Sequence, residues 1–182
     1  MALLNIVKDP DPELRLKAKP VTLPLTKEKR DLILSMVDYL KKSQDEEYAK
    51  KNQIRPGVGI AAPQIGVSER FYAIYMDDED KHYEYGLVNP VILSSSAKKA
   101  YLATGEGCLS VPKDVEGYVY RYLRVTIKAY DAISEKEVTL RLSGYPAMVF
   151  QHEYDHLDGV LYYDRIDKKE PFREDPEAVR IE

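Results

Sequence analysis

The sequence predicts an α+β fold in which mainly antiparallel sheets pack around a central HExxH helix, with a further helix near the N-terminus. A segment that begins at residue 27 has apolar residues with helical period, and a second helical segment begins at Pro146. Between them lie segments rich in Tyr, Val, Ile and Thr, which are typical of strands. Short turns such as DDEDK and DAISE separate these segments.

Length and composition indicate a single domain, residues 1–182. A chain of 182 residues removes roughly 70% of its unfolded surface from water on folding, so one core is expected. The 27 basic and 31 acidic side chains give a net charge of -4, and 44% of the residues are hydrophobic. This balance favours neither a disordered chain nor a polyanion-binding surface, and no direct nucleic acid ligand is expected.

The sequence contains no segment expected to cross a membrane. No apolar run approaches the ~20 residues that span a bilayer, and the first residues, MALLNIVKDPDPELRLKAK, lack the apolar core of a signal peptide. We therefore expect a soluble, cytoplasmic protein.

The N-terminal third is expected to hold one helix. An extended, proline-dotted opening ends at Thr26, a residue suited to cap a helix. The apolar face of the helix that follows is formed by Leu32, Ile33, Met36, Val37 and Leu40. The polar stretch Ser43–Pro56 is interpreted as the solvated end of this helix followed by a surface loop.

Four segments are expected to be strands and one to be the second helix. The strands are expected within residues 70–76, 83–93, 118–130 and 136–142, and VRIE at 179–182 could add an edge strand. After Gly144, Pro146 can occupy the first turn of a helix that carries AMVFQHEYDHL and that Gly159 would terminate.

The HExxH motif in this helix predicts a metal site. His152 and His156, four residues apart, project from one face and can bind a single ion, with Glu153 beside it. A chance match on a solvated helix is the alternative, but the apolar residues before His152 indicate that the helix enters from the core. The third histidine, His82, lies in a charged turn and is expected to be solvated.

Cys108 is the best candidate for a third ligand. It is the only cysteine, which excludes an intrachain disulfide, and it lies in the segment GEGCLSVP, where Gly105 and Gly107 allow close backbone approach. A buried inert cysteine and a nucleophile are the alternatives. Only metal ligation gives Cys108, both histidines and Glu153 a shared purpose.

A run of small residues from Gly57 to Gly66 forms a further candidate site. The run fits neither a helix nor an alternating strand, and no strand is expected before it. It lacks the residues of a phosphate-binding loop. Such a run lets the backbone pass close to a ligand, and the side-chain amide of Gln64 could stabilise an oxyanion. A tightly packed turn with a solvated Gln64 is the alternative.

Together the segments GVGIAAPQIG, EGCLSVP and QHEYDHLDG closely resemble, in order and separation, the three signature motifs of peptide deformylase. The resemblance covers essentially the whole chain, and each key position carries the residue type that the family uses. The acidic insertion before the glycine-rich segment and the tail ending in VRIE resemble the form found in many Gram-positive bacteria.

The resemblance implies hydrolysis of the formyl group from the N-terminal formylmethionine of nascent polypeptides, with release of formate. Formylmethionyl peptides and nascent chains would be the partners, met in transient proximity to the ribosome. Cys108, His152 and His156 would hold one divalent ion per chain, which in the family is Fe²⁺. By ligand type alone Zn²⁺, Ni²⁺ or Co²⁺ would also suit these donors.

The mechanism expected from these residues gives Glu153 the role of general base toward a water on the ion. Gln64 and the backbone N–H of Leu109 would hold the oxyanion together with the metal. By resemblance, substrate contacts are assigned to Val58, Gly59 and Gly107 for the peptide backbone and to Met148 and Val149 for the methionine side chain. The resemblance also implies an ion pair between Glu106 and Arg121 behind the site, for which a solvated pair is the alternative.

Two other functions share part of the pattern. A zincin-like peptidase would draw its third ligand from downstream of the motif, where Asp155, Asp158 and Asp164 lie. A protein with a structural zinc would need a fourth protein ligand, for which His82 is the spare histidine.

Overall fold

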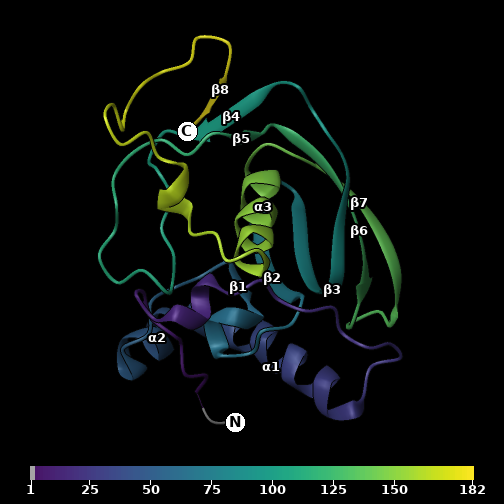
Figure 1. Cartoon of the computed structure of the whole chain (residues 1–182). Helices are drawn as coiled ribbons and strands as arrows, with labels where there is room; N and C mark the ends of the chain where they lie inside the picture. Colours follow the sequence, from purple (N-terminus) through teal and green to yellow (C-terminus); the bar gives the residue numbers. More distant parts are fainter. Residues whose placement is uncertain (1–2) are drawn as a thin grey trace.

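The structure is a computed structural model that describes residues 3–182, within which eight strands form two sheets (Figure 1). The helices are η1 (Pro12–Arg15), α1 (Lys27–Ser43), α2 (Glu46–Asn52), η2 (Ala62–Ile65), α3 (Tyr145–Leu157) and η3 (Tyr162–Arg165), of which the η helices are 3₁₀. The strands are β1 (Gly59–Ala61), β2 (Phe71–Asp78), β3 (Lys81–Ser95), β4 (Lys99–Leu102), β5 (Arg121–Tyr122), β6 (Arg124–Asp131), β7 (Lys136–Ser143) and β8 (Val179–Ile181).

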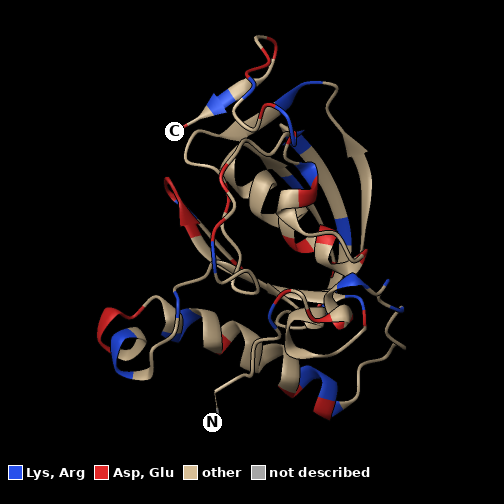
Figure 2. Ribbon diagram, turned by 60° about the vertical axis from the view of Figure 1, so that its left-hand side comes forward, with Lys and Arg blue, Asp and Glu red and all other residues tan. Residues whose placement is uncertain are grey.

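The larger sheet is antiparallel throughout and has the order β1-β2-β3-β6-β7. The smaller sheet has the order β5-β4-β8, and its β4–β8 pair is parallel. The predicted α+β class with mainly antiparallel sheets is therefore confirmed. In Figure 2 the two signs of charge are interspersed over the elements of both sheets and the helices.

The two long helices cover opposite faces of the larger sheet, because successive side chains of a strand point to opposite sides. On β2, Tyr72 and Ile74 belong to the apolar cluster around α3, whereas Phe71 and Ala73 belong to the cluster around α1. Thr26 caps α1 as predicted, and its Oγ1 accepts a hydrogen bond from the N–H of Lys29.

Helix α3 stands in the middle of the molecule and contacts strands of both sheets (Figure 1). Phe150 is completely buried and meets the rings of Tyr72, Tyr83 and Tyr85 edge to face. Gly159 follows the helix with a φ of +71°, and a Cβ there would lie 2.4 Å from the carbonyl oxygen of Arg15. Only glycine fits this position, as the predicted end of the helix requires.

The interpretation of Ser43–Pro56 as a surface loop was wrong, because the segment contains helix α2. The carboxylate of Asp45 accepts a hydrogen bond from the N–H of Tyr48 and so begins a new helix directly after α1. Ala49 is the buried residue of α2, and the remaining positions are largely charged. One buried residue in two turns leaves no apolar period to detect.

The glycine-rich segment was also misread in part. Gly59–Ala61 forms strand β1, paired antiparallel with β2, and Ala62–Ile65 forms the 3₁₀ helix η2. All three residues of β1 are buried, so the strand shows no alternation of polar and apolar residues. The smaller sheet adds β4, a strand the sequence did not predict, while the edge strand suggested for VRIE is present as β8.

Candidate functional site

The three predicted metal ligands lie together in the structure. The donor atoms of Cys108, His152 and His156 are all within 4.8 Å of one another, and Cys108 Sγ lies 3.4 Å from Nε2 of His156. The helical i, i+4 spacing brings both imidazoles to one side of α3, and the loop between β4 and β5 brings the sulfur to them. A thiolate and two imidazoles suit a divalent transition metal, and three protein donors leave a position for water or substrate. The residues therefore fit such an ion.

The two histidines differ in protonation. Burial lowers the pKa of His156 well below its usual range, so this imidazole is neutral. Nδ1 of His152 lies 2.9 Å from Oε2 of Glu106. Burial opposes the charged ring, but the contacts with Cys108 and Glu106 outweigh it and raise the pKa of His152 well above its usual range. An ion would take the place of the proton on Nε2, while Nδ1 keeps its hydrogen bond to this carboxylate.

Arg121 fixes Glu106 behind the histidine. Its Nε and Nη2 donate to the two carboxylate oxygens of Glu106 at 2.6 and 2.9 Å, and its Nη1 donates to Asp155 at 2.8 Å. Burial alone would raise the pKa of Glu106, but the Arg121 guanidinium outweighs it and the pKa is lowered to about 2. The expected ion pair between Glu106 and Arg121 is thus present, and the side chain of Arg121 is only 2% exposed.

Glu153 lies beside the donor group without a hydrogen bond to its Oε2 from any described residue. Burial raises the pKa of this carboxyl to about 7. Strand β1 runs directly against it, since a Cβ on Gly59 would lie 2.6 Å from Oε1 of Glu153. The site thus holds a buried carboxyl group that can take up or release a proton near neutral pH.

Gln64 is buried rather than solvated, with 1% of its surface exposed. The N–H of Ala61 donates to its Oε1 at 2.8 Å, which fixes the orientation of the amide. Its Nε2 then faces the site and donates to Oγ of Ser110 at 3.1 Å and toward Sγ of Cys108 at 3.5 Å.

Leu109 follows Cys108 in a tight turn that the N–H of Val111 closes by donating to the carbonyl of Cys108. The residue is buried, and no described residue accepts a hydrogen bond from its backbone N–H. Within the described residues this N–H is therefore a free donor next to the predicted metal ligands.

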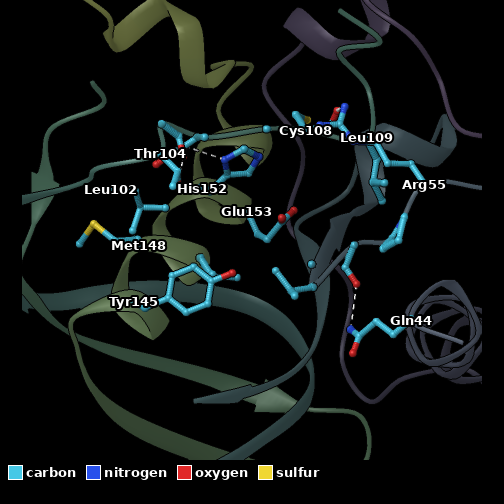
Figure 3. Close-up of a pocket in the computed structure, with 18 of the residues that line it drawn as sticks. Gln44, Arg55, Leu102, Thr104, Cys108, Leu109, Tyr145, Met148, His152 and Glu153 are labelled. Atoms are coloured by element: carbon cyan, nitrogen blue, oxygen red, sulfur yellow. Dashed lines mark hydrogen bonds and ion pairs between the residues drawn. The ribbon is translucent and has the colours of Figure 1, made fainter. Parts of the chain in front are cut away.

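A cavity of about 510 Å³ adjoins these groups (Figure 3). Its wall includes each predicted substrate and catalytic residue, namely Val58, Gly59, Gln64, Gly107, Leu109, Met148, Val149 and Glu153. Cys108 and His152 also line it, whereas His156 does not. Figure 3 shows Met148 and Tyr145 on the α3 side and Arg55 and Gln44 across the cavity.

Sequence reasoning missed several residues of the wall: Gln44, Arg55, Leu102, Thr104, Tyr145 and Glu182. Leu102 and Glu182 reach it through the parallel pairing of β4 with β8, in which Leu102 is opposite Ile181. Gln44 donates to the carbonyls of Gly57 and Tyr75. Its position just after α1 carried no recognisable motif.

The structure opposes both alternative sites. Asp155, Asp158 and Asp164, the possible downstream ligands, each pair with an arginine, and the metal-binding group found among the described residues contains none of them. The side chain of His82 is 46% exposed and faces Asp77 and Glu84. It is therefore solvated as expected and lies outside the group that a closed structural zinc site would need.

A Cys-His-His donor group with a proton-accepting glutamate on the same helix, opening into a cavity, defines a metal-dependent hydrolase. Comparison with known proteins identifies the family. The family model for polypeptide deformylase matches residues 3–172, and the chain belongs to this family.

Proteins of similar sequence support the same family assignment. The chain is 49% identical to peptide deformylase 2 of Geobacillus stearothermophilus over 182 residues, which is 100% of this chain and 98% of that protein. It is 49% identical to peptide deformylase of Staphylococcus epidermidis, with 100% of both chains covered. These similarities confirm the expected Gram-positive-type form.

Solved structures give the same result. The peptide deformylase of Thermotoga maritima has a TM-score of 0.74 and 34% identity, with 92% of this chain and 99% of that chain covered. That of Ehrlichia chaffeensis in complex with actinonin has a TM-score of 0.76 and 30% identity, with 94% and 92% covered. The chain is an enzyme that removes the formyl group from formylmethionyl peptides. Among the described residues, no helix has the length and apolarity to span a bilayer.

Proposed function

We propose that Cys108, His152 and His156 hold one divalent ion, Fe²⁺ in the cell, at which the formyl group of nascent chains is hydrolysed. The close group formed by the three donors and Glu153 in one cavity supports this proposal. Zn²⁺, Ni²⁺ and Co²⁺ share the preference for such donors and can replace iron. When bound, the ion would supply Lewis acidity and would lower the pKa of water at the site. On this proposal residues 1–182 act as one catalytic domain in the cytoplasm, near ribosomes.

Glu153 accepts the proton of the attacking water and returns it to the leaving amine. Its pKa of about 7 supports this role, because a base that must also act as an acid works best when its pKa is close to the ambient pH. Its position against β1 supports it too. No described residue donates a hydrogen bond to Oε2 of the buried carboxyl, so this oxygen is available to accept a proton.

The N–H of Leu109 and the side-chain amide of Gln64 stabilise the oxyanion. No described residue accepts a hydrogen bond from the N–H of Leu109. The N–H of Ala61 orients the side-chain amide of Gln64. Preorganised donors of this kind stabilise developing charge without the cost of reorientation.

The peptide substrate adds a strand to the free side of β1. Strand β1 is at the edge of the larger sheet, so Val58 and Gly59 can pair with a peptide on one side while Gly107 borders it on the other. Met148 and Val149, from α3, line the pocket for the methionine side chain.

Formate release from a formyl-Met-Ala-Ser peptide tests this function, with protein purified without oxygen and then loaded with nickel or iron. Glu153→Ala should lower turnover by at least the 10²–10⁴-fold typical of a general base, with one ion per chain still bound. The matched control is Glu177→Ala, which removes an exposed glutamate of the C-terminal segment and should leave turnover unchanged.

Two results would contradict the proposal. If Glu153→Ala turned over the peptide at the wild-type rate, Glu153 would not be the general base. If His156→Ala still bound the ion, His156 would not be one of its ligands.

A further inference from the structure

The tight turn Cys108–Val111 is held by groups from distant parts of the chain. Nζ of Lys8 donates to the carbonyl oxygen of Leu109 at 2.7 Å, across 101 residues of sequence. The neighbouring N–H of Asp9 donates to the carbonyl of Ser110 at 2.8 Å. The N-terminal segment therefore binds the outer side of the turn.

Arg55 holds the same turn from the cavity side. Its Nη1 reaches the carbonyls of Cys108 and Val111 at 3.5 and 3.4 Å, and its Nη2 pairs with Asp114 at 2.8 Å. Gly107 makes room for the guanidinium, since a Cβ there would lie 2.7 Å from Nη2. All four carbonyls of the turn thus accept a hydrogen bond, three of them from a cationic side chain.

These contacts fix the direction of one N–H. In a trans peptide the carbonyl and the N–H lie in one plane and point in opposite directions, so a donor on the carbonyl of Cys108 orients the N–H of Leu109. A donor on the carbonyl of Leu109 fixes the next plane. With the planes on both sides of its Cα held, Leu109 cannot rotate its N–H away from the site.

We propose that Lys8 and Arg55 are positioning residues that hold the N–H of Leu109 toward the oxyanion. The inference rests on the proposed function, because it gives that N–H a catalytic role. Lys8 is the sharper test of the two. It does not line the cavity, whereas Arg55 does, so a change at Lys8 leaves the substrate-binding wall intact.

The kinetic test compares Lys8→Met with wild-type protein loaded with nickel, using the formyl-Met-Ala-Ser peptide. We expect kcat to fall on the order of tenfold, with KM and bound metal unchanged. The loss is smaller than the 10²–10³-fold cost of removing an oxyanion donor, because the N–H of Leu109 is still present. Lys8→Arg should restore most of kcat. Lys17→Met is the matched control, because Lys17 is an exposed lysine of the same segment whose side chain bonds to no described residue.

A second measurement separates positioning from general stability. Amide hydrogen exchange, followed by NMR in the resting protein, should become faster at Val111, whose N–H closes the turn, in Lys8→Met and stay unchanged in the core strands. Unchanged kcat, or an equal loss in Lys17→Met, would overturn the inference while leaving the proposed function intact. Absence of formate release by the wild-type protein would instead overturn the proposed function.

Discussion

At the scale of single residues, Arg121 is a buried cation that pairs with two acidic side chains. It is buried between the carboxylates of Glu106 and Asp155, and Arg165 completes the charge balance by donating to Asp155. Glu106 in turn meets His152, so the arginine supports a proposed metal ligand through one intermediate side chain. Partners of this kind orient ligands and adjust their basicity.

Arg121→Ala should lower the free energy of unfolding by about 3–5 kcal/mol, because it leaves the buried carboxylate of Glu106 without its arginine and leaves Asp155 with Arg165 alone. Urea denaturation of the metal-free protein measures this. Arg180→Ala is the control, since this arginine pairs with Glu174 and Glu182 at the surface, with 45% of its side chain exposed. Exposed pairs contribute about 0–1 kcal/mol. Equal effects in the two variants would show that the buried network adds nothing.

At the scale of elements, the β2–β3 hairpin carries a charge cluster at its turn. The register places Asp77 opposite His82, and Glu84 joins from β3 while Lys41 reaches Glu84 from α1. Both ring nitrogens of His82 face carboxylate oxygens, at 2.6 and 3.1 Å. Only the protonated imidazole can donate to both, and the contact with Asp77, followed by that with Glu84, raises the pKa of His82.

This raised pKa sets the sign of a pH effect on stability. The contribution of His82 is fully present below its unfolded pKa of about 6.5 and is lost as the pH rises through the folded value. His82→Gln should therefore destabilise the protein at pH 5.5 and have less effect at pH 9. The difference should be below about 1 kcal/mol, since the side chain is half exposed. Urea midpoints across this range test it, and a constant difference at all pH values would contradict it.

At the scale of the whole molecule, the donor group links a loop of the smaller sheet to the central helix. Cys108 lies between β4 and β5 of the smaller sheet, and the two histidines belong to α3, which packs on the larger one. An ion bound there stabilises the folded state by mass action, by about 2.7 kcal/mol at a free concentration of 100 times its dissociation constant. Zinc should therefore raise Tm in the wild-type protein and not in His156→Ala. An equal rise in both would place the stabilising ion elsewhere.

The parts of this architecture that could be predicted are those encoded locally. Helix α1 has a clear apolar period, α3 has the start and end signals Pro146 and Gly159, and the HExxH spacing brings two donors and Glu153 together within one helix. The approach of Cys108 to the two histidines was predictable because the chain has a single cysteine, which follows Gly105 and Gly107.

What could not be predicted depends on contacts between distant segments or on elements too short for a pattern. The β4–β8 pair joins residues almost eighty positions apart, and no local feature of either strand shows the pairing. The contact of Lys8 with Leu109 is of the same kind. The three residues of β1 are too few for a period.

The pairing of β8 with β4 also makes the cavity accessible to optical measurement. Glu182, the residue after β8, lines the cavity, whereas Cys108 is only 5% exposed. A cysteine introduced at Glu182 would therefore react with a thiol-directed dye well before Cys108 does. A solvent-sensitive fluorophore attached there would change its emission when a ligand displaces water from the cavity. Ligand binding could then be measured without turnover.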